Sequence, residues 1–180
     1  MVDGLLESNN TIGSESNWEK ADVRKDRKTS LDVLDIHPYL AMEEPTYDPS
    51  RPLATTTLVY QYKLVNCPGK STVGLLVEYP PDGATPPHRH GGASVSAYVI
   101  KGSVLNKMNN DPMKVVEQGG SWYEAPGCHH RISANASKTE PAAFFVNFVL
   151  DTETLEREGP AVLVQYDEEY KEIVAQKMKA

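Results

Sequence analysis

The sequence contains no long apolar run. Nowhere in its 180 residues do eighteen apolar residues follow one another, as a transmembrane helix requires. The first residues also lack the basic and apolar regions of a secretory signal peptide. We therefore expect a soluble, cytoplasmic protein that has no membrane partner.

Cysteine and positive charge are both scarce. Only Cys67 and Cys128 are present, and because the cytosol keeps thiols reduced, we expect no disulfide. The formal net charge is −7, and the one basic cluster, Arg24 to Lys28, is interrupted by Asp26. Nucleic-acid binding depends on clustered lysine and arginine. The composition therefore argues against a nucleic-acid partner.

Long helical patterns are absent from most of the chain. Its 13 prolines and 12 glycines separate short stretches rich in β-branched and aromatic residues, which is typical of strands joined by turns. We predict an all-β sandwich or barrel at residues 31–165, beginning with a short edge strand or turn at residues 31–40. A polar, flexible arm is expected at residues 1–30. An apolar stripe at helical spacing predicts a C-terminal helix at residues 166–180.

Four of the five histidines form two close groups. His88 and His90 are one residue apart, so an extended strand places both imidazoles on the same face. His129 and His130 form the second group, and His37 stands alone. Imidazoles grouped in this way can bind a metal or transfer protons.

The first group lies in a stretch that resembles a motif of the cupins, a family of small β-barrels or jelly rolls. The motif joins a glycine, a His-x-His pair, a glutamate and a second glycine at fixed spacing. Gly83, His88, His90 and Gly102 match it, with four residues instead of five in the first gap. Val95 stands where the family usually carries the glutamate. The resemblance implies a cupin jelly-roll barrel in which this carboxylate ligand is missing.

The second group resembles the second cupin motif. Taking Gly119 as its start places His130 in register, with Pro126 and Asn135 each one place beyond the proline and asparagine of the family. The resemblance makes His130 the third site histidine. His129 next to it should point to the opposite side of its strand.

If His88, His90 and His130 converge, two chemistries are open. Their neutral imidazoles can bind Fe, Mn, Ni, Cu or Zn and leave coordination positions free, and the cupin resemblance implies such a divalent metal. In a cofactor-free site, the same imidazoles would act as acid and base. Both interpretations make the three histidines catalytic.

Further residues are candidates for the site. Glu78 is the one charged residue of an apolar strand, so it is either a buried catalytic acid with a raised pKa or turned to solvent. The candidate substrate contacts are Val95, Trp122, Tyr60, Tyr62 and Asn147. Aromatic residues on one strand face, such as the two tyrosines, are more commonly core residues. A polar residue such as Asn147 is as often bonded to a neighbouring backbone group.

Glu124 and Arg131 flank the second histidine group and carry opposite charges. We interpret them as an ordinary surface or interface pair, the kind that contributes little to stability.

Three functions follow from this interpretation. The first is a nonredox lyase-type enzyme, a dehydratase, isomerase or cyclase, with hetero-Diels-Alder chemistry included, that acts on an aromatic, polyketide or terpenoid intermediate. It rests on a resemblance to small cupins of natural-product biosynthesis in size and in the text from Trp122 to Asn135. The second is a three-histidine iron dioxygenase, and the third is a noncatalytic small-molecule binder. Because Val95 leaves an apolar surface beside the imidazoles, we favour the first. By analogy with cupins we also expect a homodimer.

Overall fold

The computed structural model of the protein describes residues 43–179. The predicted arm at residues 1–30, the segment 31–40 and His37 lie outside the described residues. The strands are β1 (Thr55–Lys63), β2 (Lys70–Tyr79), β3 (Ala84–Thr85), β4 (His88–Arg89), β5 (Ser94–Lys101), β6 (Ser103–Met108), β7 (Lys114–Glu117), β8 (Ser121–Glu124), β9 (His130–Asn135), β10 (Ala142–Asp151) and β11 (Gln165–Tyr166). The helices are α1 (Thr152–Glu158), the short 3-10 helix η2 (Gly159–Leu163) and α2 (Glu168–Lys177).

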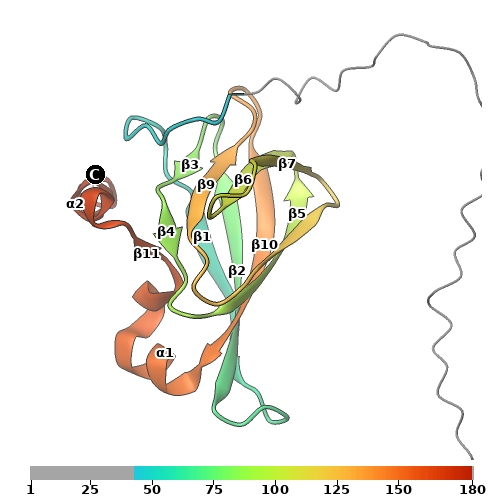
Figure 1. Cartoon of the computed structure of the whole chain (residues 1–180), viewed down its shortest axis with the longest axis vertical. Coiled ribbons are helices and arrows are strands. Elements are labelled where there is room, and N and C mark those ends of the chain that lie inside the picture. Colours follow the sequence, from blue (N-terminus) through green and yellow to red (C-terminus); the bar gives the residue numbers. More distant parts are fainter. Residues whose placement is uncertain (1–42, 180) are drawn as a thin grey trace, which may run out of the picture. The chain divides into compact units, whose positions relative to one another are not determined.

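Two antiparallel sheets face each other (Figure 1). One has the strand order β1-β2-β10-β5-β8, and the other has the order β11-β4-β9-β6-β7 with β3 paired to β9. Most neighbouring strands are distant in sequence, as in jelly rolls. The predicted all-β jelly-roll fold is therefore confirmed. Within the described residues, no helix has the length and apolar character needed to cross a bilayer.

The core forms because apolar residues alternate along the central strands. In β10, Phe144, Val146, Phe148 and Leu150 are buried, and the residues between them are less so. β2 and β5 follow the same alternation, with Val73 fully buried. The inner faces of these three strands thus line the space between the sheets, where the site lies.

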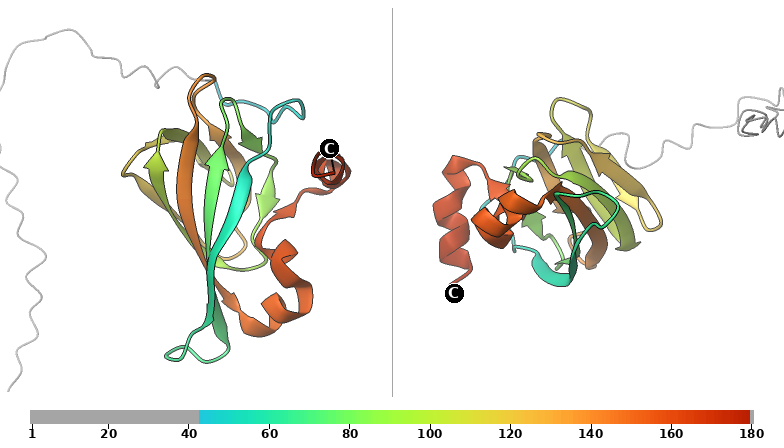
Figure 2. Two further views of the ribbon diagram at one scale, coloured as in Figure 1. Left: turned by 180° about the vertical axis from the view of Figure 1, so that it is seen from behind. Right: turned by 90° about the horizontal axis from the view of Figure 1, so that it is seen from below.

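The C-terminal segment turns back along the barrel (Figure 2). β11 pairs with β4, which sets Tyr166 opposite His88. α2 confirms the predicted C-terminal helix, although it begins at Glu168 because Tyr166 belongs to a strand. α1 cannot be predicted from the sequence pattern, because a seven-residue helix that buries only Leu155 has no apolar stripe.

Gly91 is the contact point between the β4–β5 turn and η2. Its φ of +57° is left-handed, and a Cβ at this position would overlap Val162 Cγ2 and lie 2.8 Å from the Val162 carbonyl oxygen. Gly92 is also left-handed, at φ +79°, but a Cβ there would meet nothing within 4 Å. Gly91 and Gly92 therefore share a left-handed backbone conformation, but only Gly91 is packed closely against η2.

We predict that Gly91→Ala destabilises the protein more than Gly92→Ala. The left-handed conformation costs an alanine about 1 kcal/mol at either position, and the overlap with Val162 adds about 1–3 kcal/mol at Gly91 alone. Urea denaturation of both variants measures the difference. Equal losses in the free energy of unfolding would show that η2 does not pack on this turn.

Candidate functional site

A large cavity occupies the space between the sheets. Its volume is about 1050 Å³, and the C-terminal segment covers part of it. The apolar wall comes from the inner faces of β2 and β10 through Val73, Leu75, Val77, Phe144, Val146 and Phe148. Further lining residues include Thr85, Ser133, Gln165 and Tyr166 together with three histidines. The cavity is thus apolar over most of one wall and polar around the imidazoles.

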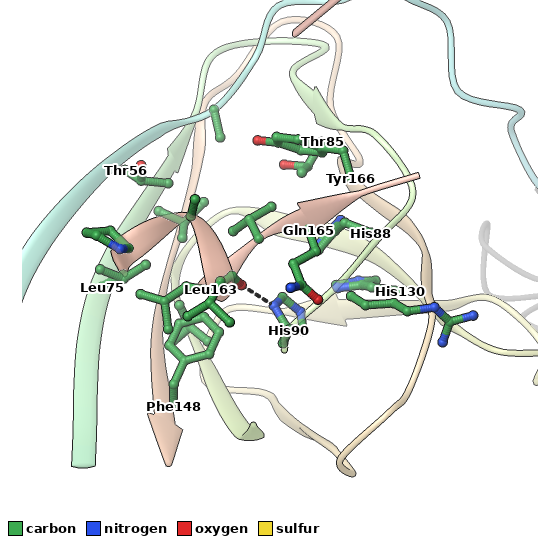
Figure 3. A pocket seen from close by; sticks show the side chains of 18 of the residues that line it. Thr56, Leu75, Thr85, His88, His90, His130, Phe148, Leu163, Gln165 and Tyr166 are labelled. Carbon is green, nitrogen blue, oxygen red and sulfur yellow. Dashed lines mark hydrogen bonds between the residues drawn. The ribbon is translucent and has the colours of Figure 1, made fainter. Parts of the chain in front are cut away.

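The three predicted histidines lie together in this cavity (Figure 3). His88 begins β4, His90 follows it, and His130 begins β9 directly opposite His88 in the pairing. Their relative exposures are 3%, 8% and 3%, and one ring nitrogen of each lies within 4.8 Å of the others. The alternation of β4 and the pairing of β4 with β9 therefore bring together two groups that are distant in sequence.

Backbone carbonyls fix the orientation of two of the rings. His88 Nδ1 lies 2.6 Å from the Pro86 carbonyl oxygen, and His90 Nδ1 lies 2.6 Å from that of Leu163. A carbonyl only accepts hydrogen bonds, so each Nδ1 carries the proton and donates it. In the neutral rings, the Nε2 lone pairs are left available to a ligand.

Burial keeps the imidazoles of His88 and His130 neutral. It lowers the pKa of His88 well below the ordinary 6.5, and the neighbouring His130 and His90 add to the shift. Burial also lowers the pKa of His130 to about 4, although the Glu124 carboxylate acts in the opposite direction. Both rings are therefore unprotonated at neutral pH, the form that binds metals and accepts protons.

Glu124 is a site residue that the sequence analysis missed. It ends β8, is 2% exposed, and its two carboxylate oxygens lie 3.1 Å from His90 Nε2 and 3.4 Å from His130 Nδ1. The predicted surface pair with Arg131 is wrong, because Arg131 donates to Asn110 Oδ1 and points outward. Period-two alternation places Glu124 on the same face of β8 as Trp122. This pattern is the sequence signal from which an inward-facing Glu124 could have been predicted.

The Glu124 carboxylate is ionised at neutral pH. Burial alone would raise its pKa, but the neighbouring His90 and His130 and the Trp122 indole outweigh that effect and lower it on balance. Trp122 Nε1 donates a hydrogen bond of 2.9 Å to one carboxylate oxygen. The cluster therefore contains a buried negative charge beside neutral rings.

Comparison with known proteins identifies the family. Residues 75–148, which contain all three site histidines and Glu124, match the cupin domain family model. These residues form a cupin domain. No curated protein matches the sequence of this cupin.

Solved structures share its fold at low identity. A cupin domain from Bordetella pertussis is 20% identical, with a TM-score of 0.44 over 56% of this chain and 96% of its own. A double-stranded β-helix protein from Klebsiella pneumoniae is 19% identical, with a TM-score of 0.46 over 62% and 94%. The DMSP lyase DddQ of Ruegeria pomeroyi is 20% identical, with a TM-score of 0.40 over 46% and 40%. These likenesses concern the fold alone.

The histidine cluster of this cupin fits a divalent metal ion. His90 Nε2, His130 Nε2 and one Glu124 oxygen are buried without a hydrogen-bond partner. Buried polar atoms are normally satisfied, and a bound cation would satisfy several such atoms at one place. Imidazole donors suit Fe, Mn, Ni, Cu and Zn.

Three of the predicted site residues do not line the cavity. Glu78 is exposed on the outward face of β2, which rules out the buried catalytic acid and leaves the solvent-facing alternative. Val95 is fully buried in the core, and Trp122 is half-buried, where it holds Glu124. Val95 and Trp122 therefore do not line the cavity, although both residues neighbour Glu124.

The remaining predicted substrate contacts lie on the wrong face of the sheet. Tyr60 and Thr72 both donate to Asn147 Oδ1, at 3.0 and 2.6 Å, on the outward face of the five-stranded sheet. Tyr62 stacks on Tyr60 with 5.6 Å between ring centroids and is 64% exposed. None of the three lines the cavity. A β-bulge between Leu58 and Tyr60 breaks the alternation of β1, so Leu58 and Gln61 line the cavity while Tyr60 and Tyr62 face outward.

The side chain of His129 points away from the cavity, as predicted. Unlike His130, it is not among the cavity-lining residues, and its Nε2 lies 2.9 Å from Asp167 Oδ2, just before α2. The side chains of Gln165 and Tyr166 are further residues that the sequence analysis missed. In Figure 3, Gln165 extends toward His90 and His130.

We predict that the metal-free protein loses stability as the pH falls from about 6.5 to about 4. The folded-state pKa of His130, about 4, lies below its ordinary value of 6.5, so the unfolded chain binds more protons in this window. His130 alone accounts for about 3 kcal/mol, and His88 adds to it. Urea denaturation in chelator at several pH values measures the slope.

The double variant His88→Asn/His130→Asn should lose most of this pH dependence. The matched control is His129→Asn outside the cavity, which should keep it. A wild-type free energy of unfolding that stays constant between pH 6.5 and pH 4.5 would contradict the burial of neutral imidazoles.

Proposed function

We propose that this cupin is a nonredox enzyme of the lyase or isomerase type, acting on a largely apolar small molecule in the cavity. The observation that carries the proposal is a buried group of three imidazoles in a cavity with an apolar wall. Small-molecule sites typically combine apolar walls with a few convergent polar groups. The cupin fold and the cavity support a small-molecule enzyme or binder, and the dehydratase, isomerase or cyclase is our finer proposal.

The cavity favours a substrate with an extended apolar body. The β2 and β10 residues that line it carry no charge, and the volume of about 1050 Å³ is at the upper end of the range for drug-sized ligands. An aromatic, polyketide or terpenoid intermediate has these properties. Arg89 lines the cavity, but its guanidinium donates to the Gly127 carbonyl at 2.7 Å. An apolar skeleton with one or two oxygen groups suits this lining best.

The imidazoles give this site its chemistry. His88, His90 and His130 would hold a divalent ion, which supplies a Lewis acid that polarises a carbonyl or hydroxyl group. Burial raises the pKa of Tyr166, so this phenol stays protonated. Tyr166 lines the cavity across the pairing from His88, with 6.2 Å between ring centroids. Its hydroxyl can therefore donate a hydrogen bond to a substrate oxygen beside the histidines.

The apolar walls would keep water from the reacting atoms. Electrostatic interactions strengthen where water is excluded, and an elimination or cyclisation also needs protection of its reactive intermediate. Gln165 extends toward His90 and His130 and can orient an oxygen group by donating or accepting a hydrogen bond. Binding, orientation and exclusion of water are thus the tasks assigned to the residues around the imidazoles.

Turnover assays test the proposal. Hydroxylated aromatic and polyketide-type compounds should be converted without oxygen consumption, and His88→Ala should lower the rate by about 100-fold or more. Tyr62→Phe on the outward face is the control and should leave the rate unchanged. Oxygen uptake in proportion to product formation would instead show that the protein is a three-histidine dioxygenase. Saturable binding without conversion would show that it is a noncatalytic binder.

The predicted homodimer and cytoplasmic location stay predictions. A second copy could pair along β1, an edge strand whose residues are nearly all exposed and which pairs only with β2 within the described part of the chain. The molar mass in solution is the measurement that decides the oligomeric state.

A further inference from the structure

We propose that Glu124 is a metal ligand that replaces the missing carboxylate of the cupin motif from the neighbouring strand. In the family, this carboxylate stands at the position of Val95 in β5. Here it would come from β8. The inference rests on the metal-binding part of the proposed function and does not depend on the reaction.

The strand register places Glu124 beside the vacated position. Val95 pairs with Glu124 across β5 and β8. Residues directly opposite each other in an antiparallel pair project from the same face, with Cβ atoms about 5 Å apart. Both residues are buried, at 0% and 2% exposure. The Glu124 carboxylate therefore reaches the histidine cluster from β8, the strand next to β5, on the same inner face of the sheet.

The contact between Glu124 and His90 requires a cation. Because His90 donates from Nδ1 to the Leu163 carbonyl, its Nε2 presents a lone pair when the ring is neutral. This nitrogen lies 3.1 Å from Glu124 Oε2, which also only accepts hydrogen bonds when ionised. Two acceptors at this distance repel each other unless a proton or a metal ion lies near both.

A metal ion accounts for more of the structure than a proton does. His90 Nε2, His130 Nε2 and Glu124 Oε2 are all buried without a hydrogen-bond partner. A proton on His90 would satisfy one pair and leave His130 Nε2 without a partner. A divalent ion satisfies all three atoms, and the single negative charge of Glu124 offsets half of its charge.

Three of the four proposed ligands, His88, His90 and Glu124, are held from behind by a further hydrogen bond. Pro86 and Leu163 accept from the Nδ1 atoms of His88 and His90, and Trp122 donates to Glu124 Oε1 at 2.9 Å. This arrangement leaves Glu124 Oε2 free and pointed at His90. Metal ligands in proteins are oriented by such outer hydrogen bonds, and here the bond to Glu124 comes from its own strand.

Titration with Co²⁺ and Zn²⁺ tests the assignment on the full chain without any substrate. Glu124→Gln keeps the size of the side chain and removes its charge, so we expect its affinity for Co²⁺ to fall about 100-fold or more, with a changed visible absorption spectrum. Glu78→Gln on the outward face of the same sheet is the matched control and should bind as the wild type does. The double variant Val95→Glu/Glu124→Gln returns a carboxylate to the family position and should regain most of the affinity.

Two results would overturn the inference. In the first, Glu124→Gln binds Co²⁺ within about twofold of the wild type and with the same spectrum. Glu124 would then pair with a protonated His90 and would not be a metal ligand. In the second, the wild type binds neither metal, and turnover by metal-free protein then remains a separate test of the proposed function. The proposed reaction can fail without affecting either titration.

Discussion

The structure depends on one costly arrangement, the burial of four polar side chains at one point of an apolar interior. Three imidazoles and a carboxylate are each at most 8% exposed. Burying such groups without partners costs several kcal/mol, and the chain offsets only part of this cost through Pro86, Leu163 and Trp122. The buried acceptors that remain are the physical reason to infer a cation. The pairing of β4 with β9 brings the imidazoles together, and β8 of the other sheet adds Glu124.

The C-terminal segment is part of this site as well as a covering element. Leu163, at the end of η2, accepts the hydrogen bond that orients His90, and β11 adds Gln165 and Tyr166 to the cavity lining. The left-handed turn at Gly91 allows η2 to approach closely enough for that contact. Residues that follow the barrel strands therefore help to determine both the tautomer of a site histidine and the shape of the substrate space.

The sequence predicted the fold and the three histidines because both depend on local patterns. Alternation and turns predict strands, and the spacing of His88, His90 and His130 matches two family motifs. The face of a strand that is buried, and the register between strands, depend on tertiary packing. For this reason Tyr60 and Asn147 were assigned to the wrong side, and Glu124 was taken for a surface residue. Its position opposite Val95 is a matter of strand pairing that sequence spacing does not contain.

The central claim is that a divalent ion binds where the imidazoles and Glu124 meet. Anomalous diffraction at the zinc edge, from crystals of the Zn²⁺-loaded protein, tests it most directly. The account predicts one peak per chain about 2.0–2.2 Å from His88 Nε2, His90 Nε2, His130 Nε2 and Glu124 Oε2. The absence of a peak among these atoms, or a peak elsewhere on the protein alone, would contradict it.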